Sequence, residues 1–249
     1  PPGARRAALR AVELEPELAE AHAALGFVAL FYDFDRAHGE RELREAIRLN
    51  PAYATAHQWL AYALSSMKRF DEAVHEIETA RAIDPFSLSI ATDVGDILLY
   101  ARRYGDAVRE SRKAIELDPH FIQAHISLGQ ILKAKGDFEG AIREFSFAGR
   151  KDLLASAYAL SGRKEDARRL LGEFSASPSP HGGHWYWGRA QILASLGERD
   201  EAVRSLWKAY EDRIGILVLL DVDPDADSLR SDRRFAELLQ RIYAGPSAG

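Results

Sequence analysis

The 249-residue sequence contains no cysteine, a single methionine and no long apolar run. The absence of cysteine excludes disulfides, thiolate catalysis and cysteine-based zinc or iron–sulfur sites. The most apolar stretch, GILVLLDV at residues 215–222, is far shorter than the roughly 18 residues that a membrane-spanning helix needs. The opening PPGARRAALR lacks both the apolar core of a signal peptide and an initiator methionine, so we expect a piece of a longer chain.

A strong excess of charge of one sign is also lacking. Lys and Arg total 33 against 38 Asp and Glu, which gives a formal net charge of −5. Nucleic acids and anionic membranes are bound by basic surfaces, so this balance argues against either as the main ligand. A Gly-rich phosphate loop, a G-x-S-x-G elbow and an H-E-x-x-H motif are missing as well. We therefore expect no enzyme activity and no cofactor.

The sequence does contain one short motif that is repeated at a fixed interval. AIRLNPAYATAH, ARAIDPFSLSI and AIELDPHFIQAH place Pro51, Pro85 and Pro119 at steps of 34 residues. A further copy, AVELEP, places Pro16 35 residues before Pro51, so the first interval has one extra residue, around FYDFDRAH. A constant period in this range is the signature of a repeat array.

Each interval contains two helical patterns. Between Pro51 and Pro85, apolar residues recur at helical spacing in two groups. The first group is Ala56, Leu60, Ala63 and Leu64, and the second is Ala73, Ile77, Ala80 and Ile83. Asp71 stands where it would cap the second helix, and the next proline ends that helix. The small residues in both patterns would let the two helices pack closely against each other.

The repeated pattern resembles the tetratricopeptide repeat, a helix–turn–helix of about 34 residues. It combines small residues, a Leu-Gly pair, Ala-x-x-x-Phe and a terminal Pro. Where Trp and Tyr are common in that family, this sequence has His22, His57, Ala91 and His125, and Leu64, Leu98 and Leu132. The resemblance implies an all-α, right-handed superhelical solenoid of antiparallel helix pairs, with about six units and a C-terminal capping helix.

The resemblance extends to a narrower group. YARRYGDAV and the closing DVDPDADSLRSDRRFAELL are similar to the C-terminal repeat region of bacterial multidomain signalling proteins. In those proteins a winged-helix regulator, a nucleotide cyclase or a Ser/Thr kinase domain precedes the repeats. This likeness implies a regulatory or scaffolding part of a larger bacterial signalling protein.

On this basis we divide the chain into repeats and two ends. Residues 1–17 are expected to form the second helix of a truncated repeat, and repeats follow at 18–53, 54–87, 88–121, 122–148 and 149–174. A loop rich in Ser, Pro and Gly (175–184) precedes the sixth repeat (185–214) and a C-terminal capping segment (215–249). The final helix would be capped by Ser231 or Asp232 and would bury Phe235, Leu238, Leu239 and Ile242.

The resemblance also implies a function in protein–protein recognition, because the first helices of stacked repeats line a concave groove that takes a peptide or a partner helix. We expect the groove to be lined by Phe27, Phe31, Gln58, Tyr62, Thr92, Asp96, Tyr100, Gln130 and Lys133. These side chains contact a partner, or else face solvent or the chain's own C-terminal segment. Members that hold the C-terminal carboxylate of chaperones need a cluster of cations at such positions, and this sequence lacks it.

Two segments resemble metal sites only superficially. Asp221, Asp223, Asp225 and Asp227 alternate as in a calcium-binding loop, but Ala226 replaces the turn Gly, Pro224 stiffens the loop, and Asp232 stands where a bidentate Glu belongs. We expect a solvated turn there. His181 and His184 lie beside Trp185 and Trp187 without a nearby carboxylate. We expect solvated histidines, aromatic rings packed into the sixth repeat, and no bound metal.

Two alternatives remain open at this stage. The truncated first repeat leaves Ala7, Leu9 and Ala11 uncovered, so the chain could pair with a second copy as a homodimer. The chain could also be an ancillary domain fused to an enzyme or to a DNA-binding module. The default location is the cytoplasm, or the periplasm if a membrane span precedes this segment.

Overall fold

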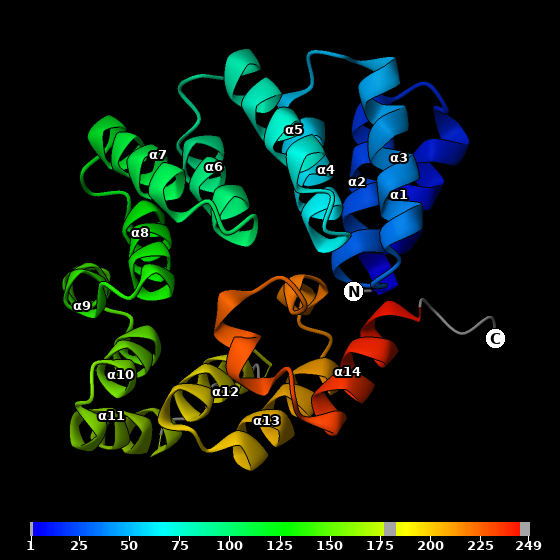
Figure 1. Ribbon diagram of the computed structural model, residues 1–249. Helices are drawn as coiled ribbons and strands as arrows, with labels where there is room; N and C mark the ends of the chain where they lie inside the picture. The colour runs from blue at the N-terminus through cyan, green and yellow to red at the C-terminus, as the bar shows by residue number, and fades with distance from the viewer. Residues whose placement is uncertain (1, 177–182, 245–249) are drawn as a thin grey trace.

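The computed structural model describes residues 2–176 and 183–244, which form fourteen α-helices and two short 3-10 helices without a β-strand. Most helices lie in antiparallel pairs that stack one after another along an arc (Figure 1). None of the helices in these residues combines the length and the apolar character needed to cross a lipid bilayer. The predicted all-α solenoid of helix pairs is confirmed.

The helix pairs follow the order of the chain. The first helices are α2 (Ala19–Phe31), α4 (Ala54–Ser66), α6 (Leu88–Tyr100), α8 (Ile122–Lys135), α10 (Lys151–Leu160) and α12 (Gly183–Leu196). Their partners are α3 (Arg36–Leu49), α5 (Phe70–Ile83), α7 (Tyr104–Leu117), α9 (Phe138–Phe147), α11 (Lys164–Ala176) and α13 (Arg199–Glu211). A single helix, α1 (Pro2–Leu14), packs on α2, and α14 (Arg233–Tyr243) follows α13 after a segment with two 3-10 helices.

Small residues set the distance between paired helices. The repeated apolar positions Ala56, Leu60, Ala73 and Ile77 are completely buried between α4 and α5. A methyl group added at Gly129 of α8 would lie 2.4 Å from the Phe145 ring of α9, so only glycine allows this ring to lie so close to the helix. The Leu-Gly pair of the sequence pattern is therefore a packing requirement rather than a turn signal.

Two predictions about helix caps have different outcomes. Asp232 accepts a hydrogen bond from the Arg234 backbone at the start of α14, as expected. The prediction for Asp71 is wrong, because α5 already begins at Phe70 and Arg69 occupies the cap position. Asp71 lies instead in the first turn of α5, where a carboxylate interacts favourably with the positive end of the helix dipole.

The first repeat makes contacts across the arc. In the turn between α2 and α3, Phe34 adopts a left-handed backbone (φ 57°) and is 3% exposed. Its ring stacks on Tyr210 of α13, with centroids 6.1 Å apart. Nearby, the Arg36 guanidinium lies 3.8 Å from the centre of the Tyr243 ring of α14. The first repeat thus contacts the last one, and the arc closes on itself.

The chain between α13 and α14 turns into the interior of this closed arc (Figure 1). We call residues 214–230 the inner segment; it contains η1 (Gly215–Leu219) and η2 (Pro224–Leu229). Leu217, Val218, Leu219, Leu220 and Val222 are all at most 3% exposed. The apolar stretch noticed in the sequence is therefore the core of the closed arc.

The predicted loop at 175–184 is described only at its edges. Helix α11 extends to Ala176 and α12 begins at Gly183. The remaining loop residues, including His181, lie outside the described residues. His184 is exposed at the start of α12, while the Trp185 ring stacks on Phe174 of α11 with centroids 5.8 Å apart. The aromatic rings of this stretch therefore contact the fifth helix pair as well as the sixth.

Candidate functional site

The predicted groove residues lie on α2, α4, α6 and α8, and one of them, Lys133, contacts the inner segment. Gln58, Thr92, Tyr100 and Lys133 are buried, with exposed fractions of 8%, 0%, 8% and 3%. Their side chains are engaged within the chain: for example, Gln58 donates to Asp93 over 2.6 Å. Phe27, Phe31, Tyr62, Asp96 and Gln130 are partly buried. We call the four buried residues the covered part of the predicted groove and the five partly buried ones its open part.

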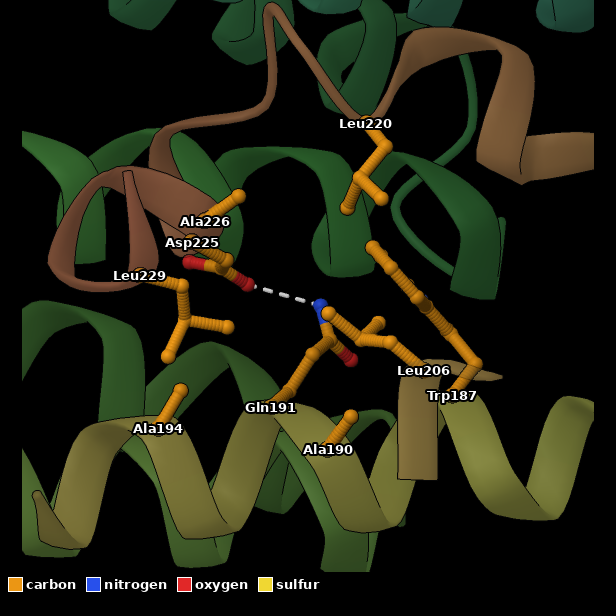
Figure 2. Close-up of a pocket in the computed structure, with 9 residues that line it drawn as sticks. All are labelled: Trp187, Ala190, Gln191, Ala194, Leu206, Leu220, Asp225, Ala226 and Leu229. Atoms are coloured by element: carbon orange, nitrogen blue, oxygen red, sulfur yellow. Dashed lines mark hydrogen bonds between the residues drawn. The ribbon is translucent and has the colours of Figure 1, made fainter. Parts of the chain in front are cut away.

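Ion pairs attach the inner segment to the covered part. The Lys133 ammonium lies 2.7 Å from Asp225, and the Lys133 side chain is only 1% exposed. Asp225 also accepts a hydrogen bond of 2.7 Å from Gln191 of α12, as Figure 2 shows. Arg102 binds Asp227 through two hydrogen bonds of 2.7 and 2.8 Å. The inner segment is thus bound from both sides of the arc.

These contacts correct the prediction of a solvated turn at residues 221–232. Asp221 pairs with Lys68 at 2.7 Å, and Asp223 accepts a hydrogen bond of 2.8 Å from the Asp225 backbone and so caps η2. Within the described residues, no three acidic or histidine side chains converge in a way that would hold a metal ion. Asp221, Asp225 and Asp227 bind the chain's own basic residues, and Asp223 caps η2.

Three side chains that reach from turns between paired helices to the C-terminal third of the chain share one backbone feature. Phe34, Lys68 and Arg102 occupy equivalent turns between paired helices and have positive φ values of 57°, 61° and 60°. The equivalent turn after α8 has Gly136, the residue that this conformation favours. In the first three repeats, a long side chain replaces glycine and contacts the C-terminal third of the chain. The 34-residue spacing of these exceptions was a sequence signal that our prediction did not use.

Partly buried carboxyl groups lie on α6 and on the inner segment. Burial raises the pKa of Asp93 to about 6. Burial, together with the charge of Asp93, raises the pKa of Asp96 to about 7. Burial and the charge of Asp225 raise the pKa of Asp223 to about 7. Burial also raises the pKa of Tyr100 well above its ordinary value. These positions therefore favour neutral acids.

A small apolar cavity separates η2 from α12 (Figure 2). Its walls are formed by Trp187, Ala190, Gln191, Ala194, Leu206, Leu220, Asp225, Ala226 and Leu229. The Gln191 carbonyl oxygen is buried and has no hydrogen-bond partner among the described residues. Apart from the Gln191 side chain and Asp225, the walls of the cavity are apolar. We therefore interpret the cavity as a packing gap between the inner segment and α12.

The open part of the groove is aromatic. The Phe27 ring lies 4.8 Å from Phe31 and 4.6 Å from Trp59, measured between centroids, and Phe31 lies 6.2 Å from Tyr62. All four side chains are partly exposed on α2 and α4. We call these four residues the aromatic surface. Trp59 was missed by the sequence analysis, although it lies one turn before Tyr62 on the same helix.

Comparisons with known proteins agree with this architecture. Sequence models described as tetratricopeptide repeat match residues 93–146 and 153–214 in one case and 54–86 in another, together more than half of the chain. The chain is a tetratricopeptide repeat protein. Repeats of this family are protein–protein interaction modules. No curated protein matches this tetratricopeptide repeat protein in sequence.

Solved structures show the same fold. A tetratricopeptide repeat protein from Parabacteroides merdae has a TM-score of 0.65 at 15% identity, with 89% of this chain and 90% of that chain covered. The human IFIT1 dimer with m7Gppp-AAAA has a TM-score of 0.65 at 16% identity, covering 96% and 67%. PilF of Pseudomonas aeruginosa has a TM-score of 0.56 at 19% identity, covering 83% and 96%. At these identities the likeness concerns the fold alone.

Proposed function

We propose that this tetratricopeptide repeat protein binds a partner protein, and that a peptide or helix of the partner docks on the aromatic surface of α2 and α4. The observation that supports this most directly is the contact between Phe27 and Trp59, at 4.6 Å between ring centroids, with both rings partly exposed. Buried aromatic side chains contribute much of the binding energy at protein interfaces. The two rings lie on packed helices, so little ordering is needed when a partner binds.

The covered part of the groove is less suited to binding a partner protein. A partner that replaced the inner segment would have to compensate for exposing Leu217, Val218, Leu219 and Leu220, which are completely or almost completely buried. Each such side chain contributes about 1.5–3 kcal/mol through burial. A partner that binds beside the inner segment avoids this cost. For this reason the proposal places the contact at Phe27, Phe31, Trp59 and Tyr62.

We further propose that the chain is the regulatory or scaffolding part of a larger bacterial signalling protein. This part of the proposal rests on the resemblance of YARRYGDAV and DVDPDADSLRSDRRFAELL to the repeat regions of such proteins. The aromatic surface would then recruit either a separate partner or another domain of the same protein.

Site-specific crosslinking in cells of the source organism would test the proposed surface. A photoreactive phenylalanine analogue would replace Trp59 in one variant and His75, which is exposed on α5, in another. We expect a discrete protein adduct from position 59 that is absent from position 75. The adduct should disappear when Phe27→Ala is added. Equal adducts from both positions, or no adduct from position 59, would contradict the proposal.

A second candidate function is self-association through α1. Leu9 and Leu14 on this helix are 39% and 63% exposed, although most large apolar side chains of the protein are buried. Two copies of α1 could cover each other's apolar positions. We expect a mass above that of the monomer in light scattering at high protein concentration, and a monomer for Leu9→Glu with Leu14→Glu. A monomeric wild-type protein at all concentrations would exclude this function.

A further inference from the structure

The first helices of successive repeats carry different side chains at corresponding positions. Trp59 and Tyr62 of α4 correspond to Asp93 and Asp96 of α6, one period of 34 residues later. Phe27 of α2 corresponds to Tyr62, because the first interval is one residue longer. Corresponding positions of stacked repeats lie on the same face of the solenoid. The face that is aromatic on α2 and α4 therefore becomes acidic on α6.

Direct contacts join these acidic positions to the aromatic surface. Gln58 of α4 donates a hydrogen bond of 2.6 Å to Asp93 Oδ2. The Tyr62 ring, at the edge of the aromatic surface, lies 6.5 Å from the Tyr100 ring of α6, measured between centroids. Asp96 precedes Tyr100 by one helical turn on α6. The two acidic residues therefore border the aromatic surface.

The acidic residues of α6 have no counter-charge from the chain itself. Asp93 and Asp96 are both partly exposed, and within the residues that the structure describes neither forms an ion pair with a basic side chain. Asp96 accepts a hydrogen bond of 2.5 Å from the Ser127 hydroxyl, which is uncharged. The cations Lys133 and Arg102 are bound to carboxylates of the inner segment. Two carboxyl groups beside an exposed aromatic surface thus remain for the cation of another molecule.

We propose that the partner segment is a basic peptide, in which an apolar side chain lies on the aromatic surface and a Lys or Arg side chain pairs with Asp93 and Asp96. The inference rests on the proposed function, because it names the chemistry of the partner at the same surface. Opposite charges across an interface select the partner and fix its orientation. Arginine fits best, since its guanidinium can donate two parallel hydrogen bonds to a carboxylate.

The packing of the helices sets the spacing between the two anchors of the peptide. Helices α4 and α6 contact each other, and the axes of packed helices lie about 8–10 Å apart. An extended chain advances about 3.3 Å per residue. The basic residue should therefore lie about two to four positions from the apolar one, and a base about eight positions away would miss α6.

The ionisation of the two carboxyl groups decides the pH at which binding is measured. Burial raises the pKa of Asp93 to about 6, and burial together with the charge of Asp93 raises the pKa of Asp96 to about 7. A cation of the peptide stabilises both carboxylates and so lowers these pKa values. At pH 8 both groups are ionised before the peptide binds, so this pH is the appropriate one.

Selection from a phage-displayed library of random 12-residue peptides at pH 8 would test the inference. We expect the enriched peptides to combine an aromatic or aliphatic residue with Lys or Arg two to four positions away. Asp93→Asn with Asp96→Asn should abolish the preference for the base and keep the preference for the apolar residue. The amide oxygens still accept the hydrogen bonds from Gln58 and Ser127, so this double variant should remain folded.

A control variant carries the same change in net charge elsewhere. Asp71→Asn with Glu116→Gln alters exposed positions on α5 and α7 and should leave both preferences unchanged. For an enriched peptide, fluorescence anisotropy at pH 8 should show binding about tenfold weaker when its base is replaced by Gln. That replacement changes only the peptide, so it tests the contact even if the Asp93 and Asp96 double variant fails to fold.

The outcomes separate this inference from the proposed function. Enriched peptides that carry apolar residues without an excess of bases, or a preference for bases that persists in the folded double variant, would overturn the inference and leave the aromatic surface as the docking site. Selection that yields no peptide whose binding depends on Trp59, tested with Trp59→Ala, would contradict both.

Discussion

His57 Nδ1 lies 2.6 Å from Glu76 Oε2, so the first helix of the repeat is joined to the second. The Nε2 atom of the same ring lies 3.1 Å from the carbonyl oxygen of Pro51. A carboxylate and a carbonyl can only accept hydrogen bonds, so this arrangement favours the protonated imidazole, in which both ring nitrogens donate. One side chain therefore connects α4, α5 and the preceding proline turn.

The same arrangement recurs along the solenoid. His22 contacts Glu42 at 2.7 Å and Pro16 at 2.9 Å. His125 contacts Glu144 at 2.6 Å and Pro119 at 3.0 Å. These histidines stand where tryptophan is common in the family, so a polar, hydrogen-bonded ring replaces an apolar one. The third repeat has Ala91 there and lacks the arrangement.

The contacts of His57 and His22 predict that stability falls as the pH rises above 6.5. The hydrogen bond to Glu76 raises the pKa of His57 above 6.5. Burial alone would lower the pKa of His22, but contacts with Glu42 and Pro16 raise it. Because the pKa is raised in the folded state, the stabilisation is complete below pH 6.5 and is lost as the pH rises through the folded-state pKa. Nuclear magnetic resonance titration of the imidazole signals would check this, with ordinary values for both rings as the contradicting result.

Replacing His57 with Gln should lower the free energy of unfolding by about 1–3 kcal/mol, because Glu76 loses a charged hydrogen-bond partner. The same replacement at His75, which is exposed, should change it by less than about 0.5 kcal/mol. Urea denaturation at pH 6 and pH 9 would measure both. We expect the difference between the two variants to shrink at pH 9, and a constant difference would argue against a protonated His57.

Gly129→Ala should destabilise the protein by about 1–3 kcal/mol, because the new methyl group would lie 2.4 Å from the Phe145 ring. Gly172→Ala is the matched control, since α11 leaves open space there. Alanine is favoured over glycine within helices by up to about 1 kcal/mol, so this control should be neutral or stabilising. Thermal unfolding would compare the two, and equal midpoints would contradict the packing argument.

Phe34→Ala should weaken the closure of the arc. Phe34 stacks on Tyr210 and is 3% exposed, and truncation of such a side chain costs about 3–5 kcal/mol. Phe86→Ala, at a position that is 83% exposed, should change stability by less than about 0.5 kcal/mol. Denaturation would measure stability, and small-angle X-ray scattering would report a larger radius for Phe34→Ala only. An unchanged radius would show that the arc closes without this ring.

Lys133→Met should cost about 3–5 kcal/mol, because Asp225 would lose its buried cation. Lys135→Met, at an exposed position on the same helix, serves as the control and should have little effect. Adding Asp225→Asn to Lys133→Met should recover part of the loss, since the unpaired carboxylate is removed. Additive losses in this double variant would show that the ion pair does not couple the two residues.

The fold could be predicted from the sequence because its determinants are local and repeated. Leu60, Ala73 and Ile77 recur at helical spacing and are completely buried. The prolines at a 34-residue period mark successive helix pairs. The groove prediction was less complete, because Gln58, Thr92, Tyr100 and Lys133 are buried within the chain, and Trp59 was missed.

What the sequence determined by itself was therefore the repeat period, the helix pairs and their buried faces, since each depends on residues a few positions apart. Only the tertiary structure decided that the arc closes and that residues 214–230 fill it. These contacts join residues far apart in the chain, as with Arg102 and Asp227, which are separated by 125 positions. Pairing at that distance leaves no periodic pattern, because it depends on how small rotations between successive repeats add up along the solenoid.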